Sequence, residues 1–217
     1  MRDLVIVGAG GFARETAAAA TTAGWRVLGF LDDNPDLHGT VRSGLPILGG
    51  TDSATRLDAE VVVCVGNPRN YTARKQIVER LGLPAERYAT VVHPAASVGA
   101  GSVLGPGTVL LAGTVLTADV EVGSHVAVMP QAVLTHDDRV EDYATIASGV
   151  RLGGGAVLET GAYVGAGALI REGVRVGAWS LIGMGSVVLT DVPADEIWVG
   201  SPARKLRSAD VTASPRS

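Results

Sequence analysis

The stretch from Val98 to Leu116 reads VGAGSVLGPGTVLLAGTVL, and its period decides the fold. An aliphatic residue stands at every sixth position from Val98 to Val188, and a glycine or another small residue often follows it. Six matches neither the period of 2 of a strand nor the 3.6 of a helix. Each hexad therefore predicts one straight side with a corner, and three sides close one triangular coil. The aliphatic side chains form the core, and glycine, which adopts positive φ without strain, allows tight corners.

The composition changes near Val92. Residues 1–92 predict strands that alternate with helices, whereas residues 93–206 are rich in Gly, Ala and Val. The chain has 217 residues and a formal net charge of −4, and no run of Lys and Arg offers a surface for nucleic-acid phosphates. We therefore expect two domains, a disordered tail at residues 207–217, and no nucleic-acid partner.

Cysteine usage and hydropathy indicate the compartment. The one cysteine, Cys64, lies in the apolar run 61–65 and predicts a small buried side chain rather than a nucleophile or half of a disulfide. No apolar run approaches the roughly 20 residues that span a bilayer, and no signal peptide is recognised. These features predict a cytoplasmic protein that does not insert into a membrane.

The first part of the chain begins with a strand at residues 4–7, which runs into the turn GAGG at 8–11 and an Ala-rich helix. Further strands are predicted at 27–31, 61–65 and 88–92, and a second helix at about 71–81. Glycines at such a turn bring N–H groups to a phosphate, and an acidic residue after the second strand can bind a ribose. These roughly 90 residues are few for a dinucleotide-binding sheet, so NAD is the weaker interpretation. The glycines can also serve only to tighten the turn.

The repeats resemble the left-handed parallel β-helix of the hexapeptide-repeat acyltransferases. With the glycine-rich turn, Asp32-Asp33 and His93-Pro94, the chain from about Leu4 to Leu206 resembles the sialic acid O-acetyltransferases and nucleotide-amino-sugar N-acetyltransferases. The resemblance implies a small Rossmann-like α/β domain at 1–92 and a β-helix acyltransferase domain with a C-terminal cap at 93–206. It also implies that the first domain binds the nucleotide of a sugar, through Gly8, Gly10, Gly11, Asp32 and Asp33.

Three histidines are candidates for chemistry: His93, His125 and His136. His136 follows the inward Leu134 by two residues, which places it off the buried stack. Imidazole can remove a proton from an attacking group near neutral pH, but a histidine here can also be a solvated corner residue. The resemblance implies that His136 is the general base and Asp137 its orienting partner.

The neighbours of His136 are expected to play lesser parts. Asp138 looks like a solvated residue. Thr145 stands where some relatives carry another histidine near the acyl site, a departure that can alter acceptor binding.

Two further segments match positions that bind the acyl donor in relatives. Gly154, in the run Gly153-Gly154-Gly155, aligns with a glycine whose N–H meets the acetyl carbonyl, and such a donor stabilises an oxyanion. Arg204 and Lys205, in a tail-closing segment after Gly200-Ser201-Pro202, are placed to meet the phosphates of coenzyme A. Capping the open end of the solenoid is an alternative role for that segment.

The resemblance implies an acetyl-CoA-dependent N-acetyltransferase that acts on a nucleotide-linked amino sugar by direct transfer in a ternary complex. It also implies a homotrimer with active sites between subunits, and we expect Val126, Val128 and Met129 on an exposed face. The alternatives are a sugar O-acetyltransferase, which the sequence does not separate, and a nucleotide-sugar-binding solenoid without activity. No metal is expected, because the spacing of His125 and His136 does not suit the zinc site of γ-type carbonic anhydrases.

Overall fold

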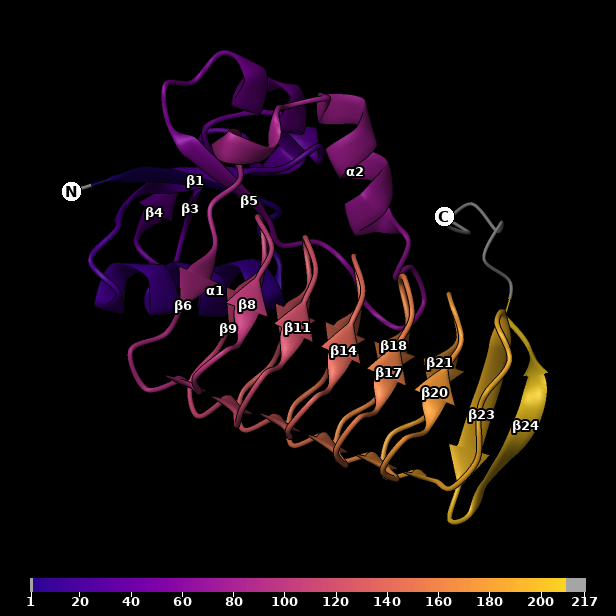
Figure 1. Ribbon diagram of the computed structural model, residues 1–217. Coiled ribbons are helices and arrows are strands. Elements are labelled where there is room, and N and C mark those ends of the chain that lie inside the picture. The colour runs from indigo at the N-terminus through magenta and orange to yellow at the C-terminus, as the bar shows by residue number, and fades with distance from the viewer. Residues whose placement is uncertain (1, 210–217) are drawn as a thin grey trace.

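The computed structural model describes residues 2–209 and consists of a front domain, residues 2–90, and a β-solenoid, residues 91–209. Figure 1 shows the front domain over the first coils and a two-stranded hairpin at the opposite end of the solenoid. The predicted boundary at residues 92 and 93 falls just inside the solenoid, because β6 (Val91–Val92) pairs with the solenoid strand β9 (Val109–Leu110).

The front domain is built around a parallel sheet with the strand order β2-β1-β5. Its strands are β1 (Asp3–Val7), β2 (Arg26–Leu31) and β5 (Glu60–Val63), its helices α1 (Gly11–Thr22) and α2 (Ala73–Leu81), and its short elements β3 (Val41–Arg42), β4 (Leu45–Pro46), η1 (Pro35–Leu37), η2 (Thr51–Thr55) and η3 (Ala85–Arg87). The chain passes from β1 to β2 on one side and then crosses to β5 on the other side. The carboxyl ends of β1 and β5 therefore border a switch point, where open α/β sheets bind ligands.

The solenoid has three faces, each a sheet of parallel strands, which are named here by what covers or lines them. The front-domain face contains β6, β9, β12 (Ala127–Val128), β15 (Thr145–Ile146), β18 (Tyr163–Val164), β21 (Leu181–Ile182), β23 (Glu196–Gly200) and the antiparallel β24 (Ala203–Ser208). The apolar face contains β7 (Ser97–Val98), β10 (Val115–Leu116), β13 (Val133–Leu134), β16 (Arg151–Leu152), β19 (Leu169–Ile170) and β22 (Val187–Val188). The charged face contains β8 (Val103–Leu104), β11 (Glu121–Val122), β14 (Arg139–Val140), β17 (Val157–Leu158) and β20 (Arg175–Val176).

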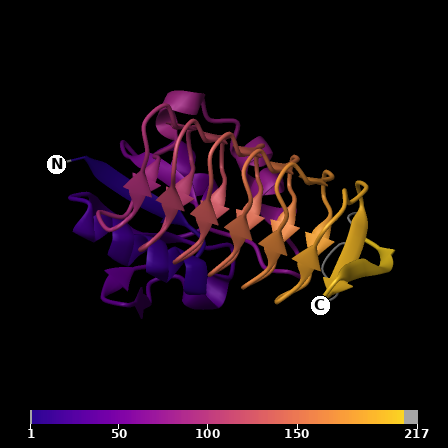
Figure 2. The ribbon, with the colours of Figure 1, turned by 60° about the horizontal axis from the view of Figure 1, so that its bottom comes forward.

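The predicted aliphatic phase is the core of this solenoid, whose stacked coils are seen in Figure 2. Every residue of the phase from Leu110 to Val188 is buried, whereas Val98 is 41% exposed in the first coil. The left-handed parallel β-helix predicted from the sequence is therefore confirmed. Val126 and Val128, expected on an exposed face, are instead 1% and 0% exposed, and Met129 is only partly exposed.

A second buried phase lies two residues before each aliphatic residue. Its members are small and apolar or carry a hydroxyl, with one exception, Asp138: they are Thr108, Thr114, Val120, Val126, Ala132, Asp138, Ala144, Val150, Ala156, Ala162, Ala168, Val174, Ser180 and Ser186. These side chains fill the space near the corners, where a larger residue has no room.

The corners use small residues for two different reasons. Positive φ occurs three residues after each aliphatic residue from Val98 to Ile182, as at Gly155 (φ 69°) and Asp137 (φ 62°). The glycines directly after the aliphatic residues have another role, since a Cβ at Gly153 would lie 2.6 Å from the backbone nitrogen of Glu172 in the next coil. The prediction that these glycines supply positive φ is wrong; they allow neighbouring coils to approach each other.

The front domain is fastened to the front-domain face by α2 and the loop before it. The buried Arg74 donates hydrogen bonds to the carbonyls of Tyr143 and Ala144 and to the Thr145 hydroxyl, at 2.9, 3.1 and 2.7 Å. The Tyr71 hydroxyl donates to the Trp179 carbonyl at 2.9 Å. These contacts fix the first domain on one side of the triangle.

The solenoid ends in the hairpin β23–β24. β24 extends to Ser208, so it includes the first two residues of the predicted tail, and residues 210–217 lie outside the described part of the chain. No helix among residues 2–209 has the length and apolarity needed to cross a membrane.

Candidate active site

His136 and Asp137 form a pair at the corner between the apolar and charged faces. The imidazole Nδ1 lies 2.7 Å from Asp137 Oδ2, and the two side chains are 70% and 69% exposed. Positive φ at Asp137 turns the chain so that neighbouring side chains on the turn face each other. The two side chains that the resemblance pairs are therefore in contact, and the second ring nitrogen, Nε2, is directed away from Asp137.

The carboxylate next to His136 changes the chemistry of the ring. The hydrogen bond that the ring donates to the Asp137 carboxylate, together with the negative charge of that group, raises the pKa of His136 above its ordinary value. A hydrogen bond at Nδ1 also selects the tautomer in which Nε2 is the proton acceptor. This corner therefore presents an exposed base.

Gly154 lies against the imidazole. A Cβ at Gly154 would be 2.5 Å from both Cε1 and Nε2 of His136, so only glycine leaves room for the ring. The adjacent Gly155 N–H donates to the His136 carbonyl at 2.9 Å. In the described hydrogen-bond network the Gly154 N–H donates to no protein group. The structure thus brings together two of the predicted site residues, His136 and Gly154.

The other two candidate histidines take part in packing and in a turn. His125 is 5% exposed between the rings of Tyr88 and Tyr143, at centroid distances of 4.6 and 5.3 Å. Burial lowers the pKa of His125 to about 4, so the ring is neutral at pH 7. His93 Nδ1 accepts the Ala95 N–H at 2.9 Å within a turn.

One prediction about the neighbours of His136 is wrong. Asp138, expected in solvent, is 0% exposed, and its carboxylate accepts the N–H groups of Thr135 and Ala156 at 2.7 and 2.8 Å. Thr145 lies on the front-domain face against Arg74 and is 8% exposed, and its place near the acyl site stays a prediction. Local polarity misleads at Asp138, because the phase of the repeat points its side chain inward.

The glycine-rich turn and Asp32 meet at the switch point of the front-domain sheet. Gly8 has φ 104°, and a Cβ there would lie 2.8 Å from the Cys64 carbonyl oxygen at the end of β5. Gly10 and Gly11 border open space. Asp32 Oδ2 accepts the Ala9 N–H at 3.0 Å, so this acidic residue is held beside the turn.

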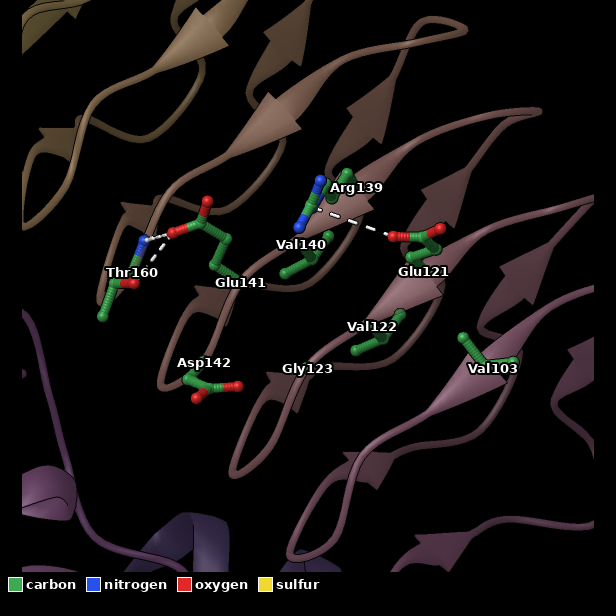
Figure 3. A pocket seen from close by; sticks show the side chains of 9 residues that line it. All are labelled: Val103, Glu121, Val122, Gly123, Arg139, Val140, Glu141, Asp142 and Thr160. Carbon is green, nitrogen blue, oxygen red and sulfur yellow. Dashed lines mark hydrogen bonds and ion pairs between the residues drawn. The ribbon is translucent and has the colours of Figure 1, made fainter.

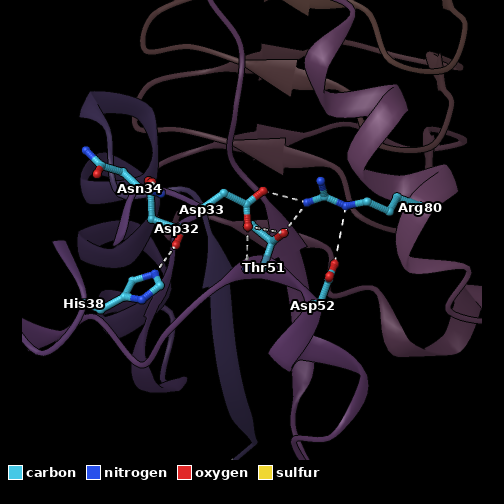
Figure 4. A network of polar contacts seen from close by, with 7 residues as sticks. All are labelled: Asp32, Asp33, Asn34, His38, Thr51, Asp52 and Arg80. Carbon is cyan, nitrogen blue, oxygen red and sulfur yellow. Dashed lines mark hydrogen bonds and ion pairs between the residues drawn. The ribbon is translucent and has the colours of Figure 1, made fainter. Parts of the chain in front are cut away.

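Asp33 points away from that turn into a polar network, shown in Figure 4. Its Oδ1 accepts the Thr51 N–H and hydroxyl at 2.9 and 2.7 Å, and Oδ2 accepts a hydrogen bond from Arg80 at 2.7 Å. Asp52 also pairs with Arg80, at 3.4 Å. Both carboxylate oxygens of Asp33 are therefore engaged in joining β2 to η2 and α2.

Arg204 and Lys205 lie on β24 at the far end of the solenoid. Lys205 Nζ donates to Glu196 Oε1 at 2.6 Å, and Glu196 also accepts the indole N–H of Trp198 at 2.7 Å. The exposed Arg204 donates only to the neighbouring Ala203 carbonyl among its described contacts. The structure does not place either residue next to His136.

A hollow of about 370 Å³ lies on the charged face (Figure 3). Its lining includes Glu121, Glu141 and Asp142, and Glu141 accepts hydrogen bonds from Thr160 at 2.9 and 2.8 Å. The lining also includes Arg139, which pairs with Glu121, so three carboxylates face one guanidinium and the net negative charge disfavours phosphate groups. Among residues 2–209, no cluster of three or more His, Cys, Asp or Glu side chains is arranged to hold a metal ion.

Cys64 at the end of β5 has no role in a site. It is 3% exposed, and burial raises the pKa of its thiol to about 12. The prediction of a small buried side chain is confirmed.

The two groups of candidate residues lie on different sides of the solenoid. The front domain covers the front-domain face, whereas His136 projects from the corner between the other two faces. In a triangular cross-section this corner is opposite the front-domain face. One chain therefore does not bring its glycine-rich turn to its own His136.

Comparison with known proteins matches each part of the chain. Residues 3–81 match the PglD N-terminal domain family. No curated protein matches the chain. The acetyltransferase domain of PglB from Neisseria gonorrhoeae FA1090, solved with acetyl coenzyme A, is 29% identical, with a TM-score of 0.85 over 94% of this chain and 99% of that one.

Two further solved structures cover nearly the whole chain. WeeI from Acinetobacter baumannii AYE is 26% identical, with a TM-score of 0.81 over 95% of this chain and 100% of that one. PerB from Caulobacter crescentus, in complex with CoA and GDP-perosamine, is 25% identical, with a TM-score of 0.76 over 94% and 97%. The chain is an acetyltransferase that is similar to these structures over nearly its whole length, and its residues 3–81 match the PglD N-terminal domain family.

Proposed function

We propose that the protein transfers an acetyl group from acetyl-CoA to the amino group of a nucleotide-linked amino sugar, with His136 as general base. The observation that carries the proposal is the exposed imidazole held by Asp137 at 2.7 Å and packed against Gly154. Two relatives support the ligands: PglB is solved with acetyl coenzyme A, and PerB with CoA and GDP-perosamine.

The proposed reaction is a direct transfer in a ternary complex. The amine nitrogen attacks the thioester carbonyl while His136 Nε2 takes a proton from that nitrogen. The carbonyl oxygen becomes negatively charged, and the Gly154 N–H, which donates to no protein group in the described network, is available to stabilise it. The C–S bond then breaks, and the imidazolium returns the proton to the thiolate of CoA.

The proposed binding regions for the nucleotide and for CoA lie where N–H groups or cationic side chains can meet phosphates. The glycine-rich turn at the switch point of the front domain binds the nucleotide phosphates through free N–H groups at Gly10 and Gly11. The Asp32 carboxylate lies beside the turn, where it accepts the Ala9 and Asn34 N–H groups at 3.0 Å each, and its remaining lone pairs can accept a ribose hydroxyl. Asp33 supports the fold around it. CoA extends from His136 along the solenoid toward the hairpin, which lies three coils, or about 14 Å, further along the axis. There Arg204 and Lys205 meet its phosphates.

The proposed active site is shared between subunits of a homotrimer. His136 lies opposite the face that carries its own front domain, so a second copy must supply the nucleotide-binding domain. The apolar face next to the His136 corner offers a surface for that contact, because Val115, Val133, Leu169 and Val187 point outward along it. Association there removes these side chains from water. Acetyl-CoA use fits the predicted cytoplasmic location.

The decisive experiment measures release of free CoA from acetyl-CoA with a panel of UDP-, dTDP- and GDP-linked amino sugars. Turnover with one acceptor, reduced roughly 10²- to 10⁴-fold in His136→Ala, supports general-base transfer. Equal rates in the two proteins would remove His136 from the mechanism. Release of CoA only with sugars that lack an amino group would show that the acceptor is a hydroxyl and that the protein is an O-acetyltransferase. The matched control is Ala118→Gly, at the equivalent corner position one coil earlier.

A further inference from the structure

Thr135 interrupts the backbone ladder of the solenoid in the coil that carries His136. In the other coils of the described residues, the N–H at this position donates to a carbonyl of the following coil, for example Thr117 to Leu134 at 3.1 Å and Gly153 to Ile170 at 2.9 Å. The Thr135 N–H instead donates to Asp138 Oδ2 at 2.7 Å, and the Thr135 hydroxyl takes its place on the Leu152 carbonyl at 3.0 Å. β13 and β16 accordingly share one residue pair, Val133 with Arg151.

The cause of the interruption is the carboxylate of Asp138 in the solenoid interior. A buried carboxylate requires hydrogen-bond donors, and the nearest ones are backbone N–H groups. One oxygen accepts the Ala156 N–H at 2.8 Å, as the hydroxyls of Ser102 and Thr108 do with the N–H groups one coil later. The second oxygen, which a hydroxyl lacks, draws the Thr135 N–H out of the ladder.

The preceding corner provides an internal reference. Residues 117–120 read TADV and residues 135–138 read THDD, so Thr and the positive-φ Asp occur in both. Val120 offers no acceptor, and the Thr117 N–H stays in the ladder. Threonine alone therefore does not interrupt the ladder. The interruption requires the carboxylate of Asp138, which the first corner lacks.

We propose that Asp138 and Thr135 are positioning residues for His136: by moving the Thr135 N–H off the ladder they set the turn that lays the imidazole against Gly154. Thr135 directly precedes His136, and the other side of the turn is pinned by the Gly155 N–H on the His136 carbonyl at 2.9 Å. Asp138 thus ties the His136 corner to the Gly154 corner through Ala156. The catalytic part assigned to Asp138 and Thr135 rests on the proposed function, whereas the displaced hydrogen bond of the Thr135 N–H is observed independently of it.

The test uses the full chain with three substitutions, of which two copy other corners. Asp138→Val copies Val120 and Val174, and Asp138→Ser copies Ser102. Thr135→Val is paired with Thr117→Val as its control. We expect Asp138→Val to fold, because valine occupies this phase elsewhere, and to lower kcat about 10- to 100-fold with the KM for acetyl-CoA changed less than about twofold. Asp138→Ser also lacks the second oxygen, so we expect its kcat to fall by a similar factor.

Each outcome decides between roles. If Asp138→Ser restores wild-type kcat, the Ala156 bond alone suffices and the assignment to Thr135 is wrong. If Thr135→Val and Thr117→Val lower kcat equally, Thr135 has no special part.

A crystal structure of Asp138→Val gives a readout without activity. We expect the Thr135 N–H on the Leu152 carbonyl and the imidazole displaced from Gly154, and an unchanged turn overturns the proposal. Loss of activity in His136→Ala with wild-type kcat in Asp138→Val would defeat this inference alone, whereas full activity in His136→Ala would defeat the proposed function.

Discussion

Corner 117–120 and corner 135–138 differ at two of four positions, and only the second carries the proposed base, His136. Ala118 is replaced by His136 and Val120 by Asp138, while threonine and a positive-φ aspartate are common to both. The first change introduces a base, and the second places a carboxylate in an interior of aliphatic and hydroxyl side chains. A regular solenoid is thus a scaffold on which one irregular coil is built, because each coil depends mainly on its neighbours.

The largest expected effect comes from filling the space under the imidazole. Gly154→Ala places a methyl group 2.5 Å from two ring atoms of His136, so the ring must move. We expect kcat to fall about 10²-fold, measured by CoA release. Alanine is tolerated at Ala118 in this corner position, so the melting temperature should change little. In the His136→Ala background, Gly154→Ala should lower kcat no further. A further loss, additive to that of His136→Ala, would show that Gly154 acts independently of the ring.

The reverse construction would make the first corner resemble the second. Val120→Asp buries a carboxylate whose available donors include the Thr117 N–H, and we expect a loss of about 2–3 kcal/mol in the free energy of unfolding at pH 8. Urea denaturation measures this loss, and Val120→Ala controls for the change in volume. A loss no greater than that of Val120→Ala would mean that a carboxylate is accommodated at any corner.

Asp137 and Asp119 occupy the same position in the two corners, so substituting each tests the orienting role. Asp137→Asn removes the charge that raises the pKa of His136, so the acid limb of the kcat/KM profile should move to lower pH. The base form of His136 is required, so wild-type activity should fall as pH drops through the raised pKa. We also expect a roughly tenfold lower kcat at pH 8, about 1.4 kcal/mol. Asp119→Asn should leave the limb unchanged, and a shift in both variants would argue against a specific pair.

The smallest expected effect is a pH-dependent stability. Burial raises the pKa of Asp138 from 3.8 to about 6, so the ionised form is disfavoured in the folded state. Its contribution to stability should therefore decline as pH rises from about 4 to 6 and stay constant above. Relative to Asp138→Val, the wild type should lose about 1–2 kcal/mol across that window. Denaturation of both proteins at pH 4.5 and 8 measures the difference, and parallel curves would show that Asp138 is solvated.

Several features of the site could be predicted from particular residues, and others could not. The exposure of His136 follows from its place two residues after Leu134, whereas its pairing with Asp137 came from the family resemblance. Stepping by six from Ala132 would also have marked Asp138 as buried. The partner of Thr145 could not be found, because Arg74 reaches it from another domain. The roles of Arg204 and Lys205 at the acyl donor remain predictions.

The sequence by itself determined the solenoid, its buried aliphatic phase and the exposed corner that holds His136. A strict repeat permits this, since a slip of one residue would expose the whole core. Only the tertiary structure decided that the front domain covers the side opposite His136 and that the Thr135 N–H leaves the ladder. These features arise from hydrogen bonds between residues in different coils or domains, such as Arg74 with Thr145 and Asp138 with Ala156, and a local pattern does not encode them.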